Sequence, residues 1–506
     1  MRLASLAAVC AVAVVVAPLP AQRAATHARE LAAIDNVVTS MMKEWQVPGL
    51  ALGIVKDGKV LYLKGYGYRD LEQQLPVTPQ TRMAIGSNSK SFTALLMGML
   101  VDQGKLDWDK PVKQYLPDFE MYDDYATRNL TPRDLVSHSS GLPRHDMVWY
   151  GRDVRRHDLL GRLKYLEPTT SLRGKWQYQN LMFVTAGILV ERLWGRSWED
   201  LIRGEIFGPL GMTQSLPGTT GIDGPGDFSW PYQLVNDKIT RIPYRVIDEV
   251  GPAGSITSTV EDMVKYIQFR LDRGAGSHRV KISAAQENLM QSPQMVVGAA
   301  AGAVWPGVEM VSYGLGLGVG SYRGHGIVIH GGGIDGFISQ MSWIPSKNIG
   351  VVVLTNSGNP IPTLVVESVY DRLLGLPPVD YAAIQRKVDA EGKAQVAKAQ
   401  AEHRASQKQG TSPSHPLAAY AGTYQHPGYG RLVIREAGGR LALGLDKLEA
   451  PLRHFHYDVF EVDPTIGTSS LSGMASFGLN LKGEVEQVAL PLEPGVKPIV
   501  FTRVKN

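Results

Sequence analysis

Cysteine is nearly absent from this chain. The 506 residues include one, Cys10, which lies in an apolar stretch near the N-terminus. A single cysteine excludes an intramolecular disulfide framework, and its apolar surroundings make a poor lipoprotein acceptor site. If that stretch is removed, the mature protein has neither a thiol nucleophile nor a cysteine-ligated metal.

An excess of charge of one sign is also missing. The chain has 52 Lys and Arg against 48 Asp and Glu, a formal net charge of +4, and no basic stripe interleaved with aromatics. This balance excludes nucleic acid as the main partner. Hydrophobic residues make up 44% and charged residues 20%, which excludes a disordered, collagen-like or membrane-bundle protein. The length allows two or three domains.

The longest apolar run begins near the N-terminus. Arg2 precedes apolar residues 4–17, which two prolines and the small residue Ala21 follow. The run is short for a membrane span and lacks a stop-transfer flank. We therefore interpret residues 1–21 as a signal peptide. This predicts export to the periplasm or medium, without stable membrane insertion after cleavage.

Changes in composition divide the rest of the chain into three segments. Residues 26–379 alternate helical and strand patterns, and residues 380–416 form a charged helical linker that ends in a Pro/Ser-rich connector. Residues 417–506 carry short strand patterns between turns, which predicts a small all-β barrel or sandwich. The expected strands of this last segment are residues 422–424, 431–434, 441–445, 459–462, 479–481 and 485–490.

The first of these segments has strand patterns at both ends and helices between them. Residues 50–56 and 59–65 alternate apolar and polar residues around Asp57-Gly58, which is typical of a hairpin. Residues 349–355 indicate a buried strand, and residues 87–103 have apolar positions at helical spacing. We expect one interrupted α/β unit.

Ser87 and Lys90 begin the predicted helix over residues 87–103. Their spacing places a hydroxyl and an amine on one helix face. An amine whose pKa is depressed by burial can accept the serine proton, and a helix start can stabilise an oxyanion. Ser40 and Lys43 have the same spacing, but we interpret them as a surface pair on an amphipathic N-terminal helix.

A second motif, Tyr178-x-Asn180, precedes an apolar helix over residues 181–193. A phenol can shuttle a proton between nucleophile and leaving group, and an amide can hold a substrate by hydrogen bonds. The alternative is an aromatic core residue beside an Asn180 helix cap.

A third motif, His330 followed by three glycines, comes after a β-rich stretch over residues 326–329. Glycines there would let a substrate backbone approach, and their amides can serve as oxyanion donors. His330 could instead be a core histidine. Gly331 also starts a formal dinucleotide fingerprint, which we reject because no convincing helix follows it.

Taken together, Ser87-x-x-Lys90, Tyr178-x-Asn180 and His330-x-Gly332 resemble the penicillin-recognising serine hydrolases. The likeness is to the class C β-lactamase-like branch, where His-x-Gly often replaces a third motif of Lys-Thr-Gly. It covers about residues 32–374. Family-like phrases at residues 83–87, 135–143, 209–212, 252–255 and 313–316 support it.

The resemblance implies a fold and a set of roles. The fold is an antiparallel sheet from both ends of the domain, an inserted helical subdomain, and a cleft between them. Ser87 would be the acylated nucleophile, Lys90 its base or charge partner, and Tyr178 the proton shuttle. Asn180 would orient the substrate amide, and the backbone N–H groups of Ser87 and Gly333 would form the oxyanion hole. Which of Lys90 and Tyr178 takes the first proton stays open.

The third motif narrows the activity that the resemblance implies. His330 and Gly331 replace a lysine and a threonine, so the ammonium and hydroxyl that would bind a substrate carboxylate are missing. His330 and Gly332 would still belong to the substrate-binding set, as in similar D-aminopeptidases and esterases. We therefore expect a peptidase of D-amino-acid type or an esterase, with at best weak β-lactamase activity, acting on a small acyl substrate.

No cofactor or metal is expected, because the sequence has no His-Glu-x-x-His. The C-terminal segment resembles β modules found on several such hydrolases. The alternative to an enzyme is a penicillin-binding sensor that is acylated without turnover, or a scaffold, since fold does not imply function. The oligomeric state is left open.

Overall fold

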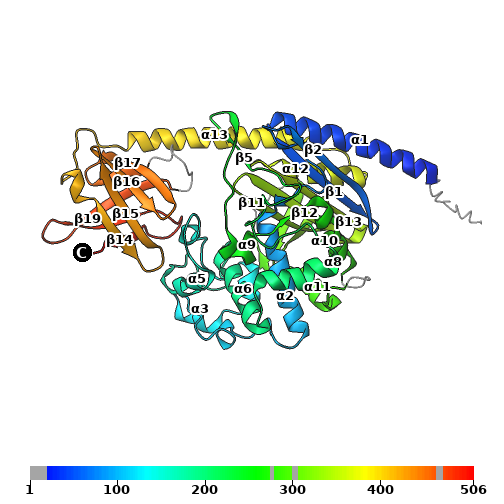
Figure 1. The fold of residues 1–506 in the computed structure, drawn as a ribbon, viewed down its shortest axis with the longest axis horizontal. Coiled ribbons are helices and arrows are strands. Elements are labelled where there is room, and N and C mark those ends of the chain that lie inside the picture. Colours follow the sequence, from blue (N-terminus) through cyan, green and yellow to red (C-terminus); the bar gives the residue numbers. More distant parts are fainter. Residues whose placement is uncertain (1–19, 274–278, 299–305, 463–470, 506) are drawn as a thin grey trace, which may run out of the picture.

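The computed structural model describes residues 20–273, 279–298, 306–462 and 471–505. It has an N-terminal α/β domain and a C-terminal barrel joined by the long helix α13 (Tyr381–Ala405), which runs along the top of Figure 1. Within these ranges no helix is both long and apolar enough to cross a membrane. Most of the predicted signal peptide, residues 1–19, lies outside the described part, and helix α1 begins at Pro20.

A nine-stranded antiparallel sheet forms the centre of the N-terminal domain. Strand β1 (Gly49–Lys56) pairs with β13 (Ile349–Thr355), so the two ends of the domain meet in the sheet, as predicted. Asp57 and Gly58 join β1 to β2 with φ angles of 51° and 74°, the left-handed values that a tight hairpin turn requires. The sheet order is β3 (Leu75–Pro76), β2 (Lys59–Asp70), β1, β13, β12 (Phe337–Ile344), β11 (His325–Ile334), β10 (Gly318–Tyr322), β9 (Val308–Tyr313) and β8 (Met295–Val296).

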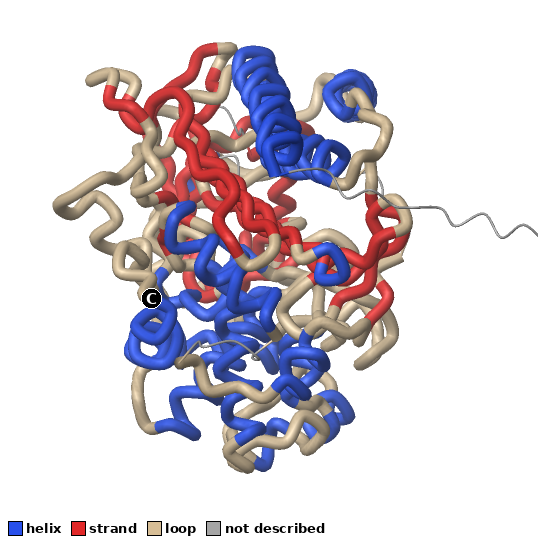
Figure 2. Tube along the Cα trace, turned by 90° about the vertical axis from the view of Figure 1, so that its right-hand side faces the viewer, coloured by secondary structure: helices blue, strands red, loops and turns tan. Residues whose placement is uncertain are grey.

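Helices cover both faces of this sheet, as Figure 2 shows. Side chains of a strand alternate between faces. Val351 and Val353 of β13 therefore pack in one core with α1 (Pro20–Glu44) and α12 (Ile361–Leu373). Val352 and Leu354 pack in the other core, which includes residues of α10 (Val260–Asp272) and of the helical subdomain. This explains why residues 349–355 are apolar without interruption.

The helical subdomain is inserted between two short strands that pair with each other, β4 (Met83–Ala84) and β7 (Thr257–Ser258). This pairing closes the insertion at its base and returns the chain to the sheet. The inserted elements are α2 (Ser89–Asp102), α3 (Asp124–Asn129), α4 (Pro132–Ser137), α5 (Arg156–Arg162), α6 (Asn180–Trp194), α7 (Trp198–Leu201), the π-helical turn Ile202–Phe207, α8 (Gly208–Leu210), β5 (Tyr232–Val235), β6 (Lys238–Arg241) and α9 (Gly251–Gly254). Helix α11 (Ala284–Met290) follows α10.

The C-terminal domain is a closed eight-stranded barrel. The fold class predicted from the sequence is therefore confirmed in both domains. The expected strand at residues 479–481 is wrong, because β19 ends at Leu479 and Asn480 starts a turn closed by its N–H to the Glu484 carbonyl. Two strands, β17 and β21, were missed. The strands are β14 (Gly422–His426), β15 (Gly430–Ala437), β16 (Arg440–Leu445), β17 (Leu448–His456), β18 (Val459–Val462), β19 (Gly473–Leu479), β20 (Val485–Leu490) and β21 (Ile499–Arg503).

Candidate active site

Ser87 lies in a 3-10 turn, η1 (Gly86–Asn88), directly before helix α2, so it faces the amide end of that helix. Strand β11 packs against this turn. A Cβ on Gly332 would lie only 1.9 Å from the Ile85 carbonyl oxygen, so no other residue fits there. The glycines expected to follow a strand are part of it, and at Gly332 the close approach is to the Ile85 backbone.

Lys90 is fully buried and its amine contacts three oxygens. Its Nζ lies 3.0 Å from Ser87 Oγ, 2.8 Å from Asn180 Oδ1 and 2.6 Å from the Ala253 carbonyl oxygen. Burial holds the pKa of Lys90 well below its ordinary value. A neutral amine has two N–H groups, and the two carbonyl oxygens can only accept them. Its lone pair is therefore left for the Ser87 hydroxyl.

Asn180 links Lys90 to Asp146. Its Nδ2 donates to Asp146 Oδ1 at 2.9 Å, and because a carboxylate only accepts, the amide oxygen must face Lys90. Asn180 is not the cap of α6. The side chain of Gln179 takes that role by accepting from the Leu181 N–H at 2.7 Å.

Tyr178 hydrogen-bonds to Ser87, and burial raises the pKa of its phenol. The Lys90 amine lies 4.7 Å from the centre of its ring, and the Arg144 guanidinium 4.9 Å. The ring also packs at 4.3 Å against that of the buried His138. A phenol with a raised pKa keeps its proton at neutral pH, so Tyr178 is suited to donate one.

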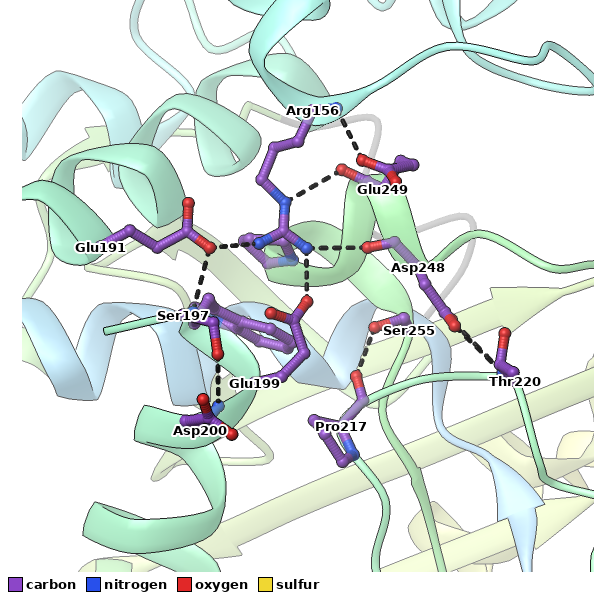
Figure 3. Close-up of polar contacts among 12 residues, drawn as sticks. Arg156, Glu191, Ser197, Glu199, Asp200, Pro217, Thr220, Asp248, Glu249 and Ser255 are labelled. Carbon is purple, nitrogen blue, oxygen red and sulfur yellow. Dashed lines mark hydrogen bonds and ion pairs between the residues drawn. The ribbon is translucent and has the colours of Figure 1, made fainter. Parts of the chain in front are cut away.

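The Ala253 carbonyl that holds Lys90 lies in α9, and a buried arginine secures the neighbouring segment. Figure 3 shows the Arg156 guanidinium between Glu191 and Glu199, with further bonds to the backbone oxygens of Asp248 and Glu249 just before α9. These contacts join α5, α6 and α7 to the start of α9. The acceptor for Lys90 is thus part of a cross-linked region.

His330 is buried and 5% exposed. Its Nδ1 lies 2.6 Å from the Gly331 carbonyl oxygen and its Nε2 lies 2.8 Å from the Tyr313 hydroxyl. Because the carbonyl only accepts, Nδ1 carries the hydrogen and Nε2 accepts from Tyr313. Burial lowers the pKa of His330 to about 3, so the ring is neutral and supplies no cation for a substrate.

A cavity of about 940 Å³ opens over Ser87 and is lined by Asn180 and Gly333 as well. Of the other residues predicted for the site, neither His330 nor Gly332 belongs to this lining within the described ranges. Ser40 and Lys43 are exposed on α1, so the structure places the second Ser-x-x-Lys pair on the surface.

The walls of the cavity contain residues that sequence reasoning missed. Arg144 pairs with Asp146 at 2.6 Å, and Arg245 pairs with Asp335 at 2.7 Å. The Tyr150 hydroxyl also donates to Asp335, at 2.7 Å. A signal was present for the first pair, because it directly follows the family-like phrase at residues 135–143. An apolar hairpin formed by β5 and β6 adds Leu234, Val235, Ile242 and Pro243.

A family model described as Beta-lactamase matches residues 34–376, and a domain of unknown function, DUF3471, matches residues 406–503. The chain therefore belongs to the Beta-lactamase family.

Named relatives and one solved structure agree with this assignment. The chain is 30% identical over 429 residues to an unguisins hydrolase of Aspergillus campestris, covering 79% of this chain and 76% of that protein. It is 28% identical over 497 residues to one of Aspergillus violaceofuscus, covering 91% and 88%. An octameric penicillin-binding protein homologue from Pyrococcus abyssi has the same fold, with a TM-score of 0.61 at 24% identity over 93% of this chain and 99% of that one. The family and the hydrolase-named relatives together support a hydrolase.

Proposed function

We propose that this protein is an exported serine hydrolase that cleaves amide or ester bonds through an acyl-enzyme on Ser87. One observation carries the proposal. The Lys90 amine lies 3.0 Å from Ser87 Oγ, and its two other partners are oxygens that only accept hydrogen bonds. A buried amine in this arrangement is a general base directed at one hydroxyl.

The two candidate bases differ in the direction of their pKa shifts. The pKa of Lys90 is lowered and that of Tyr178 is raised, in both cases chiefly by burial. Lys90 is thus ready to accept a proton and Tyr178 to give one. This difference supports Lys90 as the first base, the assignment that the sequence left open.

The chemistry then follows in two stages. Lys90 takes the Ser87 proton as Oγ attacks the carbonyl carbon, and the N–H groups of Ser87 and Gly333 receive the oxyanion. Tyr178 protonates the leaving nitrogen or oxygen as its bond to the acyl carbon breaks, and the Lys90 ammonium returns a proton to the phenolate. Water next attacks the acyl-enzyme, which releases the acid and restores Ser87.

The charges in the cavity favour a substrate without a free carboxylate. Arg144 and Arg245 are each paired with an aspartate, and His330 is neutral at physiological pH because burial lowers its pKa to about 3. Apolar residues of the β5–β6 hairpin form part of the wall. We therefore favour a peptide, of D-amino-acid type, or an ester of moderate size over a carboxylate-bearing β-lactam.

The experiment that tests this function is intact-mass analysis of the mature protein after a serine-directed phosphonate, with peptide mapping. We expect one adduct, on Ser87, that Ser87→Ala abolishes and Ser40→Ala leaves unchanged. Equal labelling of both variants would remove Ser87 from the mechanism. Sequencing the N-terminus of exported protein tests cleavage after Ala21.

A parallel reaction with a chromogenic β-lactam separates the enzyme from the alternative. Slow turnover or no reaction, together with the phosphonate adduct, supports the peptidase or esterase. A stable β-lactam adduct on Ser87 without turnover would instead indicate a penicillin-binding sensor, and no adduct from either reagent would indicate a scaffold. Turnover of a panel of D-aminoacyl amides, short esters and unguisins then identifies the substrate.

A further inference from the structure

The C-terminal barrel contacts the loop that carries Asp146. The barrel lies beside the loops that precede α5 in Figure 1. Glu493, which is buried in the barrel, accepts a hydrogen bond from the His145 N–H at 2.6 Å and another from the Arg144 N–H. One barrel carboxylate thus binds two consecutive amides immediately before Asp146.

The His145 side chain is fixed by the barrel as well. Its Nε2 lies 2.9 Å from the Glu167 carbonyl oxygen and therefore carries the hydrogen, so Nδ1 accepts from the Tyr429 hydroxyl at 2.6 Å. His145 has a φ of 47°, a left-handed conformation that a histidine adopts only with support from its surroundings. Glu493 and Tyr429 supply that support.

A second anchor lies at the other end of the same loop. Arg152 donates to the Tyr429 carbonyl and pairs with Asp446 at 2.6 Å. The Lys447 N–H donates to the Gly151 carbonyl oxygen at 3.2 Å. The barrel therefore holds both ends of residues 144–152, a stretch that contributes four residues to the cavity wall.

A continuous series of hydrogen bonds leads from this loop to the nucleophile. Asp146 accepts from Asn180, whose oxygen accepts from Lys90, whose amine faces Ser87. Each bond orients the next group, so a shift of Asp146 would turn the Asn180 amide and displace the Lys90 amine. A misplacement of about 1 Å can cost about a hundredfold in rate.

We propose that Glu493 and Tyr429 of the barrel are positioning residues of the active site, which place Lys90 for catalysis through His145, Asp146 and Asn180. The proposal rests on the function proposed above, because Lys90 must act on Ser87. It gives the barrel a role inside the catalytic machinery that is independent of covering the cleft or assembling subunits.

The test compares full-length Glu493→Gln and Tyr429→Phe with the unmodified protein. The matched control is Glu449→Gln, whose carboxylate is also in the barrel but pairs with the exposed Arg435. Two readouts are followed: the pH dependence of phosphonate labelling at Ser87, and hydrogen–deuterium exchange of a peptide spanning residues 144–149. Melting temperature reports any loss of overall stability.

We expect both positioning variants to label about tenfold more slowly or worse, with faster exchange at residues 144–149 and a shifted acidic limb of the labelling profile. The Glu449→Gln control should match the unmodified protein in every respect. A variant that loses only melting temperature would overturn the proposal, since a purely structural contact would do that. If the unmodified protein is not labelled, the proposed function fails, and unchanged exchange in the variants would then overturn the positioning role separately.

Discussion

The Lys90 amine donates to the side-chain oxygen of Asn180 at 2.8 Å, although the two residues lie 90 positions apart in the chain. Asn180 is held in turn by Asp146. The amide separates the Asp146 carboxylate from the amine, so Lys90 has a neutral neighbour where a carboxylate would stabilise its ammonium form. This arrangement underlies the predictions that follow.

Asn180→Asp should place a carboxylate beside Lys90 and raise the pKa of the amine. The base would then be protonated at neutral pH, so we expect kcat/KM at pH 7 to fall about a hundredfold and to recover partly as the pH rises. A full pH profile of kcat/KM measures this. Asn129→Asp, on the surface helix α3, is the control and should leave the profile unchanged. A uniform loss at all pH values would argue against a base role for Lys90.

Tyr178→Phe removes the phenol that we assign to leaving-group protonation. Its effect should depend on the substrate, because a p-nitrophenolate leaves without a proton whereas an amine does not. We expect a loss of about a hundredfold or more in kcat for amides and a smaller loss for p-nitrophenyl esters. Tyr122→Phe, at a side chain that is 56% exposed, serves as the control. Equal losses on both substrates would remove Tyr178 from this step.

Asp335→Asn should weaken the contacts that join Tyr150 and Arg245 across the cavity wall. These residues do not touch the reacting atoms, so the expected result is a KM raised about five- to tenfold with kcat within about twofold. Steady-state kinetics with a short and a long substrate test this. A fall in kcat with unchanged KM would place Asp335 in the chemical step.

Substrates that differ only in a terminal carboxylate or carboxamide test the charge of the cavity. With both arginines paired and His330 neutral, no cation is set aside for a carboxylate. We expect the amide to be preferred by about tenfold or more, since an uncompensated buried carboxylate costs more than the 1.4 kcal/mol that tenfold represents. A preference for the free acid in competition assays would contradict the proposed specificity.

His330 predicts a dependence of stability on pH. The folded protein keeps this ring neutral down to about pH 3, because burial lowers its pKa from 6.5. Between these two values the unfolded chain binds more protons, so the free energy of unfolding falls as the pH falls. From pH 7 to pH 5, His330→Gln should lose about 2 kcal/mol less than the unmodified protein in chemical denaturation. His157→Gln, at an exposed position, should lose as much as the unmodified protein.

Much of the fold could be predicted from the sequence because its signals are local. The Asp57-Gly58 turn and the unbroken apolar run of β13 specify their strands by turn chemistry and burial alone. The barrel strands were harder. Residues 479–481 gave an apolar signal where the chain turns at Asn480, because a short apolar run does not reveal whether its side chains are paired.

The sequence by itself determined the identity of Ser87, Lys90 and Tyr178 as candidates, since three short motifs in order carry the resemblance. Only the tertiary structure decided what surrounds them. It brought Asp146 to Asn180, turned His330 toward Tyr313, and placed Glu493 of the barrel on the backbone before Asp146. These contacts join residues up to 348 positions apart. No local pattern encodes such contacts, because they form only when separately folded elements pack together.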